Sequence, residues 1–248
     1  MPGIALKPIL PAFGGMFWIA ALGIGALFFA MRAGGTLGPV SLNFLLPLMC
    51  VAMVAVPWLL LSRDGRRQIG LQRARRGADY ATGASVGVMA AAVCFGLGFW
   101  WFGTTPDHWY VSIANRYRQS YQTQGLSVLQ LHLVFSTAAC FFSPLGEEIF
   151  FRGFLQRTLE DRFSRRRSTG IEAGFFGLVH LCHHGVAVTA GGITLRPLSG
   201  VLWVLLMSCT ALCFAWIRQR SASLWPAVLA HSSFNATMNV FIFAVLWT

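Results

Sequence analysis

Long apolar runs recur along this chain, and they constrain its fold more than any other feature. Of its 248 residues, 56% are hydrophobic and 11% are charged. This composition lies outside the range of soluble globular domains. A run of about 20 apolar residues is long enough for a helix to cross the hydrocarbon core of a bilayer. We therefore predict an all-α integral membrane protein, built as a polytopic bundle of transmembrane helices.

Short polar segments divide the sequence into about seven expected spans. Their approximate ranges are 10–31, 39–61, 80–102, 126–156, 171–190, 199–217 and 224–247. The fourth range would be roughly 46 Å long as one straight helix, which is more than a bilayer requires. Because proline is favourable at the first position of a helix, we expect a kink or break at Ser143–Pro144. The segment 103–125 carries Trp109 and Tyr110, and we expect it to be an outer loop with interfacial aromatic residues.

The net charge of +11 comes mainly from arginines that cluster between the apolar runs. The clusters lie within 63–76, 157–167 and 218–220, and in the seven-span arrangement all of them fall on one side of the membrane. Because positively charged loops lie on the cytoplasmic side, we expect a cytoplasmic N-terminus and an outside C-terminus. The charge therefore indicates topology, and the expected partner is the lipid bilayer rather than nucleic acid. Since the sequence carries no soluble domain or eukaryotic targeting segment, we expect a bacterial inner membrane protein.

Two adjacent glutamates interrupt the fourth apolar run. Glu147 and Glu148 are followed by Arg152, and ionisable residues at membrane depth are costly enough to suggest a functional site. In a helix, Glu148 and Arg152 are in the order that favours an ion pair, whereas Glu147 points about 100° away. We predict that Glu148 and Arg152 form a supporting brace and that Glu147 is unpaired. The alternative is a purely structural buried ion pair with an additional acid.

Polar residues recur at a similar depth in the later runs. His180 follows the second arginine cluster, and His231 shares one helix face with Asn235 in the last run. At 1.5 Å per residue, Glu147, His180 and His231 all lie roughly 12 to 15 Å from the arginine-rich edge. We therefore expect these side chains, from three spans, to meet in one layer of the membrane.

This set of side chains suits the attack of water on an amide. A carboxylate beside a neutral imidazole can hold and deprotonate a water molecule, so we expect Glu147 to be the base and His180 its partner. A histidine and an asparagine amide offer two donors where an oxyanion forms, which is the role expected of His231 and Asn235. We expect no metal ion and no cofactor.

Three ordered motifs on successive runs resemble those of the CAAX protease and bacteriocin-processing family, the glutamate-dependent intramembrane endopeptidases. The resemblance covers about residues 143–239, and its motifs are Glu147-Glu148-x-x-x-Arg152, Phe176-x-x-x-His180 and His231-x-x-x-Asn235. It implies a multi-span bundle with a water-filled cavity, expected to open toward the cytoplasm. It also implies cleavage of a peptide bond in a membrane-associated protein or peptide substrate. The catalytic pair would be Glu147 and His180, and the oxyanion-binding pair His231 and Asn235.

The resemblance divides the chain at about residue 125. We expect residues 1–125 to form a three-span region of unknown role and residues 126–248 to form the catalytic core. The expected reaction is the removal of a leader, a C-terminal segment or a sorting segment. The residues alone do not choose among these substrates.

Two other functions remain open from the sequence. His180 and His184 are four residues apart on one helix face, as in zinc peptidases, which is consistent with a metal-dependent membrane peptidase. A non-enzymatic immunity or scaffold protein would instead use the buried polar residues as a structural network. We expect His183 to tolerate substitution and Glu172, near the start of an apolar run, to be interfacial.

Overall fold

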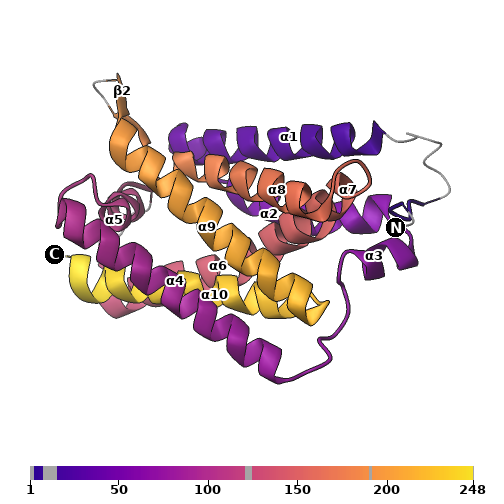
Figure 1. Ribbon diagram of the computed structural model, residues 1–248. Coiled ribbons are helices and arrows are strands. Elements are labelled where there is room, and N and C mark those ends of the chain that lie inside the picture. Colours follow the sequence, from indigo (N-terminus) through magenta and orange to yellow (C-terminus); the bar gives the residue numbers. More distant parts are fainter. Residues whose placement is uncertain (1–2, 8–15, 121–124, 190–191, 248) are drawn as a thin grey trace.

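The computed structural model describes residues 3–7, 16–120, 125–189 and 192–247 of the chain. Within this part, six helical segments are long and apolar enough to cross a membrane, and they lie together in one bundle (Figure 1). The predicted all-α polytopic membrane fold is therefore confirmed. The first six residues of the predicted first span, 10–15, lie outside the described residues. The six segments are Phe17–Leu37, Val40–Leu60, Ala78–Phe102, Val128–Leu159, Pro197–Ser221 and Trp225–Leu246.

Regular α-helices form most of the six segments. The long helices are α1 (Phe17–Leu37), α2 (Leu45–Leu60), α4 (Ala78–Phe102), α6 (Val128–Glu147), α9 (Pro197–Ser221) and α10 (Trp225–Phe241). Shorter helical elements lie between or beyond them. These are η2 (Val40–Leu42), α3 (Arg63–Gln68), α5 (Trp109–Ser120), η3 (Glu148–Leu155), α7 (Gln156–Leu159), α8 (Arg165–Val179), η4 (His180–Cys182) and η5 (Ile242–Leu246).

The fifth predicted span, 171–190, is not one long helix, so six of the about seven expected spans are long apolar helical segments in the described residues. Helix α8 has 15 residues, which is about 22 Å and shorter than a bilayer core of roughly 30 Å. It ends in η4, and the chain then turns at Gly185, whose φ of 109° suits glycine. Strands β1 (Val186–Thr189) and β2 (Gly192–Leu195) follow as an antiparallel hairpin. Residue 190, the end of the predicted span, lies outside the described residues.

Of the kink or break expected at Ser143–Pro144, the break does not occur. Helix α6 continues through Pro144 to Glu147, and the irregular stretch is the π-helix η3 that follows. Proline removes the donor that would have bonded to the carbonyl four residues earlier, which belongs to Cys140. The hydroxyl of Ser232 on α10 donates to that carbonyl at 2.7 Å. A neighbouring helix therefore satisfies the group that proline leaves unpaired, and α6 needs no break.

The segment predicted as an outer loop forms helix α5, and its first aromatic residues are buried rather than interfacial. Trp109 Nε1 donates to the Cys94 carbonyl at 3.0 Å, and the Tyr110 hydroxyl donates to the Ala91 carbonyl at 3.0 Å. Both acceptors are on α4. Because each aromatic side chain finds a partner for its polar atom inside the bundle, burial costs it no hydrogen bond.

The arginine-rich segments meet at one end of the bundle, on the right in Figure 1. Arg218 at the end of α9 donates to the carbonyl of Gln68 in α3 at 3.2 Å. Arg157 in α7 pairs with Asp161 at 2.6 Å, and Asp161 also accepts the backbone N–H of Ile4 at 3.0 Å. The clustering of arginines at one end agrees with the sequence analysis. Their exposure to the cytoplasm stays a prediction.

Candidate active site

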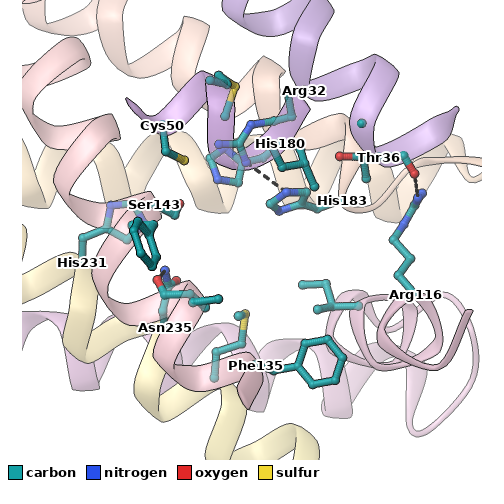
Figure 2. A pocket seen from close by; sticks show the side chains of 18 of the residues that line it. Arg32, Thr36, Cys50, Arg116, Phe135, Ser143, His180, His183, His231 and Asn235 are labelled. Atoms are coloured by element: carbon teal, nitrogen blue, oxygen red, sulfur yellow. Dashed lines mark hydrogen bonds between the residues drawn. The ribbon is translucent and has the colours of Figure 1, made fainter. Parts of the chain in front are cut away.

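A cavity of about 470 Å³ lies inside the bundle, between α1, α2, α5, α6, α9 and α10 (Figure 2). Most of its wall is apolar, and one group of polar side chains lies together at one end. Cavities of this size are typical of sites that bind small molecules or short peptide segments. Three of the four predicted catalytic residues line it, namely His180, His231 and Asn235. The other polar residues at this end are Arg32, Ser143 and His183.

From the polar end, the cavity extends toward α5. Asn43, Arg116 and Tyr117 line its far part, and Arg116 lies across the cavity from His231 in Figure 2. On the opposite, arginine-rich side of the polar end, the space is filled by buried aromatic rings that include Phe154. The sequence predicted an opening toward the arginine-rich side, whereas the lining residues extend away from it.

Glu147 is buried behind the polar end of the cavity, where it bonds to two residues of the lining, and it is not unpaired as the sequence predicted. Its Oε1 forms an ion pair with Nη2 of Arg32 and accepts a hydrogen bond from the hydroxyl of Ser143, one turn earlier on α6. Its Oε2 has no hydrogen-bond partner among the described residues. The carboxylate is thus held through one oxygen, and the other oxygen keeps its lone pairs.

Arg32 reaches this site from α1, and the sequence analysis missed it. Its side chain is buried, and its Nη1 donates to Nε2 of His183 at 3.0 Å. His183 therefore has a specific partner that its position on a helix did not indicate. The sequence feature that could have revealed Arg32 is its position directly after the predicted first span, which ended at residue 31. Because α1 continues to Leu37, Arg32 lies inside the span.

Glu148 and Arg152 form the predicted brace, with 3.1 Å between Oε1 and Nη1. The same carboxylate oxygen accepts a hydrogen bond from Nδ1 of His231 at 2.8 Å. Arg152 also lies over the ring of Phe176, with its Cζ 3.9 Å from the ring centroid. The brace therefore ties the π-helix η3 to both α8 and α10.

Glu172 is a second acid on the far side of Arg152. The sequence analysis expected it to be interfacial, but it is completely buried in α8, with its Oε1 3.6 Å from Nε of Arg152. The expectation was wrong because α8 starts earlier than the predicted span, at Arg165. One arginine thus lies between two buried carboxylates.

The partners of His231 and Asn235 decide which of their atoms remain free to act. A carboxylate can only accept when ionised, so His231 donates to Glu148 from Nδ1, which leaves Nε2 for the cavity. Its ring stacks on Phe214 at 5.3 Å between centroids. The Asn235 amide donates one of its N–H groups to the Ala139 carbonyl at 2.8 Å. Its second N–H remains available, since an amide nitrogen carries two.

His180 is placed by the C-terminal end of α8. Its Nδ1 donates to the carbonyl of Phe176 at 2.7 Å, one of the last carbonyls of the helix, which have no intrahelical partner. This hydrogen bond fixes the tautomer and leaves Nε2 as an acceptor. The ring lies 4.3 Å from Phe176 and 5.1 Å from His183, measured between centroids. Phe176 thus separates the His180 side of the site from Arg152.

His184 points away from this cluster. Its Nδ1 and Nε2 each bond to a serine hydroxyl at 2.9 Å, from Ser112 and Ser199 respectively. It therefore does not form the pair with His180 that a zinc peptidase would use. In the described part of the chain, no group of three or more His, Cys, Asp or Glu residues is arranged to hold a metal ion.

With this geometry described, comparison with known families is informative. Residues 129–237 match the family model for type II CAAX prenyl endopeptidase Rce1-like proteins. This segment, 109 of the 248 residues, is similar to the Rce1-like family. No curated protein and no solved structure matches the chain.

The Rce1-like segment runs from the start of α6 into α10. It contains the four predicted catalytic residues, the brace and Glu172, whereas Arg32 lies outside it. The chain therefore combines the spans of an integral membrane protein with a segment similar to an endopeptidase family. Its site is completed by a side chain from the N-terminal region.

Proposed function

We propose that this protein is an intramembrane endopeptidase that hydrolyses a peptide bond by means of a water molecule activated by Glu147 and His180. The observation that carries the proposal is the convergence of a buried carboxylate and two oriented histidines at one end of an apolar cavity. An apolar wall with few polar groups is typical of ligand sites. Here it suits a peptide segment that is itself membrane-associated.

In this mechanism, water binds between the free oxygen of Glu147 and Nε2 of His180. Both atoms are acceptors, so together they hold the two protons of water and direct its lone pair toward a substrate carbonyl. Glu147 takes the proton as the oxygen attacks. The same proton then passes to the leaving amine, so the carboxylate is restored at the end of the reaction.

The oxyanion would form near His231 and Asn235. Asn235 offers its second amide N–H. The Nδ1 of His231 is already bound to Glu148, so Nε2 is the nitrogen that would donate to the oxyanion when it carries a proton. Each preorganised donor contributes to the rate because it meets charge that develops in the transition state.

The proposed substrates are membrane-associated proteins or peptides from which a leader, a C-terminal segment or a sorting segment is removed. We further propose a bacterial inner membrane as the location, and that no metal ion or other cofactor takes part. Residues 126–248 would carry the catalytic core, and residues 1–125 would complete its cavity.

The first test is cleavage of a library of membrane-anchored peptides by the purified protein in detergent, with products read by mass spectrometry. We expect chelator-insensitive cleavage that is lost in Glu147→Gln and reduced by orders of magnitude in His180→Ala. Asn235→Ala should lower the turnover number by about 10²- to 10³-fold, as for removal of one oxyanion donor. Glu160→Gln is a matched control, since Glu160 lies outside the cavity and pairs with Arg165 at 3.8 Å. Full activity of folded Glu147→Gln would contradict the assignment.

A further inference from the structure

The ion pair between Arg32 and Glu147 raises a question of charge balance. Both side chains are buried, and the pair is neutral as long as Glu147 is ionised. In the proposed reaction Glu147 takes a proton and becomes neutral. The guanidinium of Arg32 cannot lose its proton in exchange. A buried charge without a partner is strongly unfavourable, so the reaction needs a new anion beside Arg32 at the moment when Glu147 is protonated.

The reaction itself produces such an anion. When the oxygen of water bonds to the carbonyl carbon, one proton of water moves to Glu147 and the π electrons of the carbonyl move to its oxygen. The negative charge has then left the carboxylate and lies on the tetrahedral oxyanion. When the C–N bond breaks, the oxyanion reforms a carbonyl and the proton passes from Glu147 to the amine nitrogen. Arg32 is thus beside one negative charge at every stage.

We propose that Arg32 is a further catalytic residue, which pairs with Glu147 in the resting enzyme and stabilises the oxyanion during hydrolysis. This inference rests on the proposed peptidase function. Arg32 lines the cavity, and among the described residues each terminal nitrogen makes one bond, Nη1 to His183 and Nη2 to Glu147. Each of these nitrogens carries a second N–H. The guanidinium can therefore keep its position and still donate to a new acceptor.

His183 fixes the direction of this guanidinium. Its Nε2 accepts from Nη1 of Arg32 at 3.0 Å, on the side of Arg32 away from Nη2 and Glu147. A long side chain held at both ends of its fork loses little further rotamer freedom when the substrate binds. His183 is accordingly a positioning residue for Arg32.

A second arginine of the same cavity offers a contrast. Arg116 donates from Nη1 to the Thr36 carbonyl at 2.9 Å and from Nη2 to the Val186 carbonyl at 2.7 Å. These contacts connect α5 to the end of α1 and the start of β1, at the far end of the cavity from His231 (Figure 2). Arg116 therefore serves as a control for removing a cavity arginine whose described partners are backbone carbonyls.

The test compares wild type with Arg32→Gln, Arg32→Lys and Arg116→Gln on the best peptide from the cleavage library. The measurements are kcat, KM and the affinity for two inhibitors of that peptide sequence. One is a phosphonate, which is tetrahedral and anionic, and the other is the matched hydroxyethylene, which is tetrahedral and neutral. Melting temperatures of all variants establish that they are folded.

We expect Arg32→Gln to lower kcat by about 10²- to 10³-fold, with a much smaller change in KM. It should lose phosphonate affinity by a similar factor and keep its affinity for the hydroxyethylene. Arg32→Lys should recover part of both losses, because it keeps the charge but not the fork. Arg116→Gln should affect both inhibitors equally.

Three results would overturn the inference. If kcat of Arg32→Gln equals that of wild type, Arg32 is not catalytic. If kcat falls but the preference for the phosphonate is unchanged, Arg32 acts only by holding Glu147. If wild type cleaves no peptide, the proposed function fails and the inference fails with it. If wild type cleaves the peptide and Arg32→Gln cleaves it equally well, only the inference fails.

Discussion

Arg152 lies between two buried carboxylates, and this arrangement predicts an order of stabilities. Glu148 is 3.1 Å away and Glu172 is 3.6 Å away. Arg152→Gln leaves two neighbouring acids without a cation, and removing one partner of a buried pair costs about 3 to 5 kcal/mol. Glu172→Gln leaves one arginine with one carboxylate, so it should cost much less. Thermal unfolding in one detergent tests the order, and equal losses for both variants would contradict it.

His183 provides a prediction on activity rather than stability. Its contact with Arg32 supports the positioning role proposed above, whereas the sequence analysis expected His183 to tolerate substitution. We predict that His183→Ala lowers kcat by about tenfold, since it removes the group that orients a catalytic donor. His183→Gln should restore part of the loss, because a glutamine oxygen can accept from Arg32. Both values come from peptide cleavage under the same conditions, and wild-type kcat in His183→Ala would exclude a positioning role.

At the scale of single elements, the irregular part of the chain is the run from α6 into η3. Pro144 leaves the Cys140 carbonyl without its helical donor, and Ser232 supplies a replacement at 2.7 Å. We predict that Ser232→Ala destabilises the protein by about 1 to 3 kcal/mol, the cost of an unsatisfied buried group. In a Pro144→Ala background the helix supplies its own donor, so the same change should cost less. A double-mutant cycle on thermal unfolding measures the difference, and strictly additive effects would refute this account of α6.

The sequence predicted the elements best where one physical requirement dominated. Six long apolar runs formed spans because length and hydropathy decide that outcome. The run at 171–190 did not form one long helix, because α8 ends at Val179 and a hairpin follows. Apolar content does not reveal where a chain turns to form a hairpin. The break at Ser143–Pro144 failed because the compensating donor, Ser232, lies 92 residues away from the Cys140 carbonyl in sequence. Local patterns cannot report such a partner.

In the candidate site too, the contacts set by local spacing were predictable from the sequence, and those set by tertiary packing were not. Helical spacing was sufficient to pair Glu148 with Arg152, and depth counting was sufficient to bring His180, His231 and Asn235 to one cavity. The partner of Glu147 could not be predicted, because Arg32 comes from α1 and reaches it only through tertiary packing. The tautomers of the histidines likewise depend on which acceptors the fold brings to them.

At the scale of the whole molecule, the direction of the cavity relates topology to substrate access. Its lining extends from the polar end toward α5, away from the arginine-rich end. If the positive-inside rule holds for this protein, the arginine-rich end is cytoplasmic and the cavity extends toward the outer face. Substrates would then approach from outside the cytoplasm.

Labelling in intact cells with a membrane-impermeant maleimide tests this orientation. Ser41 is exposed between α1 and α2, at the α5 end, and Asp64 is exposed in α3 at the arginine-rich end. We predict that Ser41→Cys is labelled in intact cells and Asp64→Cys only after lysis. The unmodified chain, whose cysteines lie in or beside apolar helices, measures the background. The reverse pattern would place the far end of the cavity on the cytoplasmic side, and the charge distribution would then be the wrong guide to the face from which the substrate enters.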